Sequence, residues 1–374
     1  MSYVKNWYLI LILTAYPLCG YAYTLGAFDV HLRAGLQEFF DDNVTSTKEG
    51  KKRDYITVAR VGMDALYEGK TRSLQLSGNI RQNTFLDNHN FNNTAQDFTV
   101  NFLNELSKYD RFSLSNTFSR SEEPRSFEDA FGSTAGRYRI QKNKFSLGYA
   151  RDITSQYGLT ARYVNAVDTY SRQGLADSYF NSVGLELGYR GSSSISFLCS
   201  YDFARRDFNP GNHALTHTLG AGARIYLTPQ ISFDSSVGMN FITSYDGSRH
   251  SKPFLGMAMA GELDKNTRAN LSFIKRYDTN SYSQDLFGYW QTSAGLTRTL
   301  TERLAADCYL FYGRGEYKSL GLRDKFAGTA LGLHYDLKDN VRGTITYSHT
   351  NIASNVSSRE YKKNVISVGF TIKF

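Results

Sequence analysis

Proline is scarce in this chain, and long apolar runs are almost absent. Only 5 of the 374 residues are proline, which cannot donate to a strand ladder and therefore interrupts sheets. Beyond the amino-terminal segment, no apolar stretch approaches the roughly 18 residues that a membrane-spanning helix needs. Mean hydropathy is −0.42, too low for a bundle of membrane helices. These absences exclude a helical membrane protein and favour long, uninterrupted strands.

Cysteine and catalytic motifs are also lacking. Of the 3 cysteines, Cys199 and Cys308 lie on the apolar faces of two distant alternating segments, without Cys or His neighbours at ligand spacing. We interpret them as small apolar side chains, in preference to a disulfide or a metal site. The sequence has no G-x-S-x-G, P-loop, H-E-x-x-H or C-x-x-C motif. We therefore expect no enzyme, no catalytic residue, no metal and no cofactor.

Aromatic residues and glycine are abundant instead. The chain has 27 Tyr, 25 Phe and 31 Gly, a composition typical of long, closely packed strands. Tyrosine and tryptophan often flank the apolar faces, as Tyr55 and Tyr67 do, which is typical of the interfacial girdles of membrane barrels.

The amino-terminus has the three parts of a secretory signal peptide. Lys5 supplies the positive charge, Trp7–Ala15 a short apolar core, and Gly20-Tyr21-Ala22 a small-x-small cleavage site. We predict that residues 1–22 are removed and that residues 23–374 form the mature protein. A lipoprotein signal at Cys19 is the less favoured alternative, because the residues before it are not small.

One hairpin pattern repeats through the rest of the chain. Alternating segments such as Ala27–Phe39 and Asp54–Tyr67 are joined in turn by a long polar loop and by a tight turn. This rhythm gives about eighteen strands, with sixteen as the alternative count, and predicts a single antiparallel up-and-down transmembrane β-barrel. Short turns are expected in the periplasm and long loops outside. At Arg137–Arg151 the apolar parity slips, which predicts a bulge or a longer loop.

The polar faces of these strands are expected to line the lumen. They carry both signs of charge, so either a hydrated channel with a transverse field or a salt-bridged, closed lumen would fit. The candidate lumen-facing residues are Arg33, Arg60, Arg81, Arg162, Arg224, Arg268, Arg276, Arg342, Asp64, Glu186, Asp234 and Glu262. The 43 Lys and Arg against 35 Asp and Glu favour anionic solutes. The arginines are spread among the strands, which argues against nucleic-acid binding.

Two segments resemble a known family. The first hairpin reads Glu38–Val44 (EFFDDNV), a polar loop, and then Asp54–Thr57 (DYIT). The chain ends on Ser367, Gly369, Ile372 and Phe374, which look like the assembly signal of outer-membrane barrels. With its length and hairpin rhythm, the chain resembles the family of outer-membrane β-barrel porins that accompanies exopolysaccharide synthesis and export genes. The resemblance implies no catalytic residues.

Three functions follow as hypotheses. The first is a channel of the Gram-negative outer membrane that passes exopolysaccharide, or assists its export, or passes other polar or anionic solutes. The second is a plugged barrel that binds a secretion partner. An outer-membrane enzyme is the least favoured. The expected partners are outer-membrane lipid and lipopolysaccharide, the barrel-assembly machinery, and exopolysaccharide or its export proteins.

Overall fold

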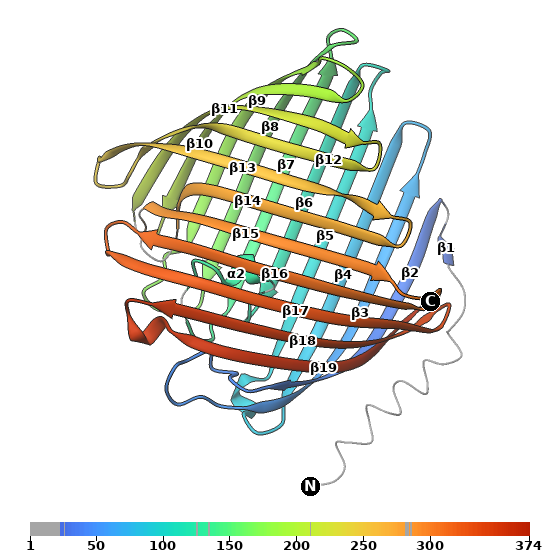
Figure 1. Ribbon diagram of the computed structural model, residues 1–374, viewed down its shortest axis with the longest axis vertical. Helices are drawn as coiled ribbons and strands as arrows, with labels where there is room; N and C mark the ends of the chain where they lie inside the picture. The colour runs from blue at the N-terminus through green and yellow to red at the C-terminus, as the bar shows by residue number, and fades with distance from the viewer. Residues whose placement is uncertain are drawn as a thin grey trace.

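The computed structural model in Figure 1 shows strands wound into a closed wall. It describes residues 23–25, 27–124, 126–133, 135–209, 211–280, 284 and 286–374. The predicted signal peptide, with Cys19, lies outside the described residues. Among those described, no helix is both long enough and apolar enough to cross a membrane.

The described residues form nineteen strands and three short helical turns. The strands are β1 (Tyr23–Leu25), β2 (Phe28–Asp41), β3 (Asp54–Glu68), β4 (Arg72–Phe85), β5 (Asn93–Glu105), β6 (Asp110–Ser121), β7 (Ile140–Asp152), β8 (Tyr157–Tyr170), β9 (Ser178–Arg190), β10 (Ile195–Phe208), β11 (Asn212–Thr228), β12 (Ile231–Thr243), β13 (Arg249–Asp264), β14 (Thr267–Thr279), β15 (Leu286–Thr299), β16 (Leu304–Tyr317), β17 (Leu322–Lys338), β18 (Val341–Ser354) and β19 (Tyr361–Lys373). The helical turns are η2 (His89–Phe91), α2 (Phe127–Ala130) and η3 (Ser357–Arg359).

The strands β2 to β19 close into a ring. Each pairs antiparallel with its neighbour along the chain, and β19 pairs with β2 from Val365↔Asp41 to Lys373↔Arg33. The nineteen strands less the short β1, which pairs only with β2, leave eighteen in the ring. The predicted single antiparallel barrel is therefore confirmed, and the alternative count of sixteen is wrong.

Alternation sets which side chains face outward. On β3, Val61 is 59% exposed, while its neighbour Arg60 lines an internal cavity. Val237 on β12 is 57% exposed in the same way. Because successive side chains of a strand point to opposite faces, each strand gives the barrel an apolar outside and a largely polar inside.

The predicted bulge near Arg137–Arg151 is wrong. β7 pairs without a register shift with β6 from Ser121↔Ile140 and with β8 from Tyr170↔Ile140. Ile140 lies on the inner face together with Lys142. The break in the apolar alternation therefore comes from one apolar side chain that faces inward, and no extra residue is inserted in the strand. The alternative of a longer loop is correct, because β7 begins only at Ile140.

Residues of the predicted assembly signal contact β2 in the structure. Ser367 is 1% exposed and is hydrogen-bonded to Gln37, and a Cβ on Gly369 would lie 2.7 Å from the Leu36 carbonyl oxygen. The Phe374 amide donates to the Leu32 carbonyl at 2.8 Å. These residues therefore close the barrel against β2, whereas their role as an assembly signal stays a prediction.

Phe374→Asp is expected to prevent assembly of most of the chains, because it places a carboxylate on the apolar outer face of the closing strand. The measurement is heat-modifiable gel migration of the membrane fraction. Lys373→Asp is the matched control, since it puts the same group on the exposed opposite face and should assemble normally. Normal levels of heat-modifiable Phe374→Asp would contradict the prediction.

Candidate functional site

The segment between β6 and β7, described at residues 122–124, 126–133 and 135–139, turns into the barrel. We call it the inserted segment. In Figure 1 α2 is drawn next to β16, and ring contacts of Phe127 with Tyr309 and Phe311 place it against that strand. The Ser126 side chain accepts a hydrogen bond from the Asp129 amide at 3.1 Å and so caps α2. The inserted segment therefore extends into the lumen and carries one short, capped helical turn.

An apolar cluster seats the inserted segment on β15 to β17. The ring of Phe127 lies 6.1 Å from that of Tyr309 and 5.9 Å from that of Phe326, between centroids. The cluster consists of Ala130, Phe131, Phe287, Phe311, Tyr317, Leu322 and Phe326. Burying one phenylalanine stabilises the folded state by about 1.5–3 kcal/mol. Phe131, at 9% exposed, therefore helps to hold the segment inside by about this much, and the partly buried Phe127 adds less.

Glycines on the inner wall make room for these rings. A Cβ on Gly328 of β17 would lie 2.7 Å from the ring of Phe127, and a Cβ on Gly313 of β16 would lie 2.9 Å from that of Phe131. Side-chain carbons do not approach so closely, so only glycine allows the segment to seat at this depth.

Polar contacts hold the turn that follows α2 in the inserted segment. Arg359, from the loop between β18 and β19, donates through Nη2 to the Ser133 carbonyl at 2.8 Å. The same guanidinium is paired with Asp324 at 2.6 Å, with the two side chains only 7% and 3% exposed. The Tyr317 hydroxyl donates to the Gly132 carbonyl. Phenylalanine contacts hold one end of the segment, and this buried ion pair anchors the next turn.

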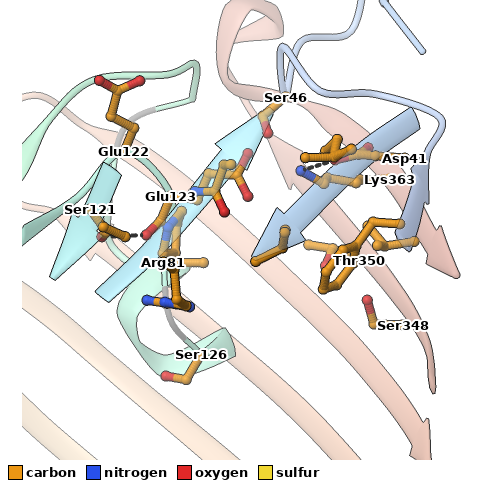
Figure 2. Close-up of a pocket in the computed structure, with 18 of the residues that line it drawn as sticks. Asp41, Ser46, Arg81, Ser121, Glu122, Glu123, Ser126, Ser348, Thr350 and Lys363 are labelled. Atoms are coloured by element: carbon orange, nitrogen blue, oxygen red, sulfur yellow. Dashed lines mark hydrogen bonds and ion pairs between the residues drawn. The ribbon is translucent and has the colours of Figure 1, made fainter. Parts of the chain in front are cut away.

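A cavity of about 720 Å³ lies between the inserted segment and the barrel wall. Strands β2 to β5 contribute Arg33, Arg60 and Arg81, and the inserted segment contributes Glu122, Glu123, Glu128 and Arg137. Figure 2 shows Lys363 joined to Asp41 on one side of the cavity and Arg81 beside Glu123 on the other. Opposite charges on wall and segment create a field across the lumen.

The carboxylate of Glu123 is the centre of this charge network. Its side chain is 41% exposed to the cavity and is paired with Arg137, whose own side chain is only 9% exposed. Burial would raise the pKa of Glu123, but the charges of Lys363, Arg137 and Arg81 together hold that pKa below its ordinary value. Glu123 is therefore ionised at neutral pH. The guanidinium of Arg137 also lies 4.7 Å from the ring centroid of Phe85.

The predicted lumen residues divide into separate groups. Arg33, Arg60 and Arg81 meet at the cavity, with Asp64 2.9 Å from Arg33. A second cavity, of about 440 Å³ near the short turns, is lined by Glu186, Arg224 and Asp234 among others. The remaining arginines are Arg162, paired with Asp202 at 2.9 Å, Arg268, paired with Glu262 at 2.8 Å, Arg342, paired with Asp336 at 2.6 Å, and Arg276, which lies at neither cavity. The arginines of the prediction therefore do not form one continuous site.

The alternation of strand residues could not reveal the loop residues that line the cavity or anchor the inserted segment. Glu123, Glu128, Arg137 and Arg359 lie outside the strands, where no period of two applies. A signal for the inserted helix is nonetheless present in Ser126–Phe131 (SFEDAF), with a capping serine and phenylalanines four residues apart.

The two cysteines of the described chain do not line the 720 Å³ cavity. Cys199 on β10 and Cys308 on β16 are free cysteines. In the part of the chain that the structure describes, no group of three or more His, Cys, Asp or Glu side chains could hold a metal ion.

Gly328→Val is expected to push Phe127 off its seat and to raise the conductance of the reconstituted barrel, because the new side chain would occupy the space of the ring. The measurement is single-channel conductance in planar bilayers. Gly343→Val on the adjacent strand β18 is the matched control, since a Cβ there meets its nearest atom at an ordinary 3.5 Å. Equal conductance of both variants and the wild type would show that Phe127 does not position the inserted segment.

The architecture is that of a closed, eighteen-stranded barrel narrowed by an internal segment. Residues 279–374 match the family model described as "Putative beta-barrel porin 2", which supports a porin family for this chain. The matched part runs from the end of β14 to the carboxy-terminus. No curated protein matches the sequence.

Several solved barrels are similar in fold at low identity. The siderophore receptor PirA from Acinetobacter baumannii is 8% identical, with a TM-score of 0.48, over 92% of this chain and 80% of that one. OccAB3 from the same organism is 10% identical, with a TM-score of 0.48, over 92% of this chain and 100% of that one. The FrpB iron transporter from Neisseria meningitidis is 10% identical, with a TM-score of 0.48, over 88% of this chain and 62% of that one.

Proposed function

We propose that this protein is a non-enzymatic channel of the outer membrane, through which polar solutes cross inside the barrel. The observation that carries the proposal is the division of each strand into an apolar outer face and a polar, charged inner face around a cavity. A soluble protein seldom leaves so many large apolar side chains on its surface. Lipid and lipopolysaccharide would cover them, and the closed ring leaves no strand edge unpaired in the bilayer.

We propose exopolysaccharide, or a precursor of it, as the solute that the channel passes or helps to export. Support comes from the resemblance of the first hairpin, Glu38–Val44 and Asp54–Thr57, to porins encoded beside such genes. In the structure Asn43 is fully buried and donates to the Lys362 and Thr47 carbonyls, so it ties the loop after β2 to β19. Much of that motif thus stabilises the barrel mouth, and the choice of solute rests on the resemblance.

The inserted segment favours a second candidate. Its apolar cluster and its tie to Arg359 fix it inside the lumen. A segment held in this way could make the protein a plugged barrel whose loops bind a secretion partner.

Planar-bilayer recording of the purified, refolded barrel distinguishes the two candidates. The channel predicts discrete conductance steps that scale with salt concentration, and heat-unfolded protein should give none. Bilayers that stay closed at all voltages, with protein that still migrates as a folded barrel, would overturn the channel. Co-purification of a partner with such a closed barrel would support the second candidate.

A further inference from the structure

Arg60 stands apart from the other arginines predicted to face the lumen. Six of them are each paired with a carboxylate within 3.2 Å: Arg33 with Asp64, Arg81 with Asp97, Arg162 with Asp202, Arg224 with Asp234, Arg268 with Glu262 and Arg342 with Asp336. Within the described residues, Arg60 and Arg276 have no ion pair. Of these two, only Arg60 lines the 720 Å³ cavity.

The ladder places Arg60 directly opposite another cation. Arg60 of β3 is the register partner of Arg81 of β4. Like charges directly opposite each other on neighbouring strands are destabilising. Such a pair would become favourable once an anion lay between the two guanidinium groups.

Arg81 and Arg137, which line the same cavity as Arg60, have side-chain donors without a hydrogen-bond acceptor. The Nε of Arg81, and the Nε and Nη2 of Arg137, are buried without a hydrogen-bond partner among the described residues, although this Nη2 lies 3.7 Å from the carboxylate of Glu122. The side chain of Arg137 is more than nine-tenths buried, at 9% exposed, and it lines the same cavity. Buried donors without acceptors are costly, at about 1–3 kcal/mol each, so a ligand that accepts hydrogen bonds would be favoured here.

The acidic groups of the cavity are already engaged with other partners. Asp41 is paired with Lys363 at 2.6 Å and Asp97 with Arg81 at 3.2 Å, while Glu123 is paired with Arg137. Glu122 lies 3.7 Å from Arg137 and 3.9 Å from Arg139, and Glu128 accepts a hydrogen bond from the Tyr309 hydroxyl. None of them neutralises Arg60, which leaves one positive charge of the wall free to meet a solute.

We infer that this cavity binds the oxyanion group of a hydroxylated solute, with the Arg60 guanidinium as its principal contact. Carboxylate and phosphate share the required chemistry, because each presents paired oxygen acceptors to a guanidinium fork. Phe127 and Tyr309 add ring surface to the cavity wall. One carboxylate oxygen of Glu128 accepts from Tyr309, and the other offers an acceptor for a solute hydroxyl. The volume is within the range of about 300–1,000 Å³ typical of small-molecule sites. The inference deepens the proposed channel function and relies on it for access of solutes to the lumen.

Calorimetric titration of the folded, detergent-solubilised barrel tests the site. The probes are glucuronate, glucose 1-phosphate and uncharged glucose, at low salt. We expect binding of one or both anions and none of glucose. Arg60→Gln should weaken the anion binding at least tenfold, whereas Arg276→Gln, the matched unpaired arginine away from the cavity, should leave it unchanged. Binding of glucuronate alone would assign the site to carboxylates, and binding of glucose 1-phosphate alone to phosphates.

Three results would overturn the inference: no binding of either anion, equal affinity for glucose, or equal losses in the two arginine variants. Heat-modifiable migration checks that each variant is folded, and Arg60→Gln relieves a like-charge pair. Because the titration needs no transport, the site and the channel can fail separately. Conductance without anion binding would support the channel and overturn the anion site. Anion binding by a barrel that does not conduct would support the site and overturn the channel.

Discussion

Replacing residues 124–135 by a short glycine–serine linker should raise the single-channel conductance several-fold. A barrel of this strand number is wide enough for an aqueous channel unless a loop or plug fills it. In this protein α2 and its flanking turns occupy that space, with Phe131 only 9% exposed against the wall of β15 to β17. The linker keeps Glu123 and Arg137, so the replacement removes neither member of that ion pair.

The control replaces residues 245–247, in the loop between β12 and β13, by glycine and serine. That loop lines neither cavity, so the conductance of this variant should remain that of the wild type. The comparison is made on variants that migrate as folded barrels. If removal of the inserted segment left the conductance unchanged, the current would have to bypass α2, and the segment could not be the constriction.

The strand pattern made the barrel predictable, because a period of two survives along each strand of a closed sheet. Arg60 lines a cavity, whereas its neighbour Val61 is 59% exposed. Which of the two faces inward can be predicted from their order in the sequence alone. The tight turns of the hairpins then set the register, so even the opposition of Arg60 and Arg81 follows from a turn near Gly69.

The candidate site was not predictable in the same way. Arg81 and Glu123 come together because a loop folds inward, and parity says nothing about loops. Arg359 meets Asp324 and the Ser133 carbonyl across 35 and 226 positions of sequence, with no local pattern that joins them. Three of the ion pairs that single out Arg60 join direct register partners: Arg224–Asp234, Arg268–Glu262 and Arg342–Asp336. The other three reach past the directly opposite residue: Arg33–Asp64, Arg81–Asp97 and Arg162–Asp202. Register and packing therefore decide which of the predicted arginines can act.

Arg359→Met should destabilise the barrel by about 3–5 kcal/mol, because it leaves the carboxylate of Asp324 buried without a countercharge. The two side chains are 7% and 3% exposed, so water cannot replace the lost partner. The measurement is urea unfolding in lipid vesicles followed by the fluorescence of Trp290 on β15. Arg342→Gln is the matched control: its pair with Asp336 has the same 2.6 Å distance, but Arg342 is 58% exposed. Exposed pairs contribute at most about 1 kcal/mol, so the control should unfold nearly as the wild type does.

Combining Arg359→Met with Asp324→Leu separates the buried charge from the tie to the inserted segment. Replacing both members of a buried ion pair by apolar residues is often neutral, so most of the lost stability should return. The Ser133 carbonyl would still lack its donor, which accounts for a remaining loss of about 1 kcal/mol. The double variant should also conduct more than the wild type, because the inserted segment has lost its anchor at Ser133. A double variant as unstable as Arg359→Met alone would mean that the stability comes from the tie to Ser133 and not from the pairing with Asp324.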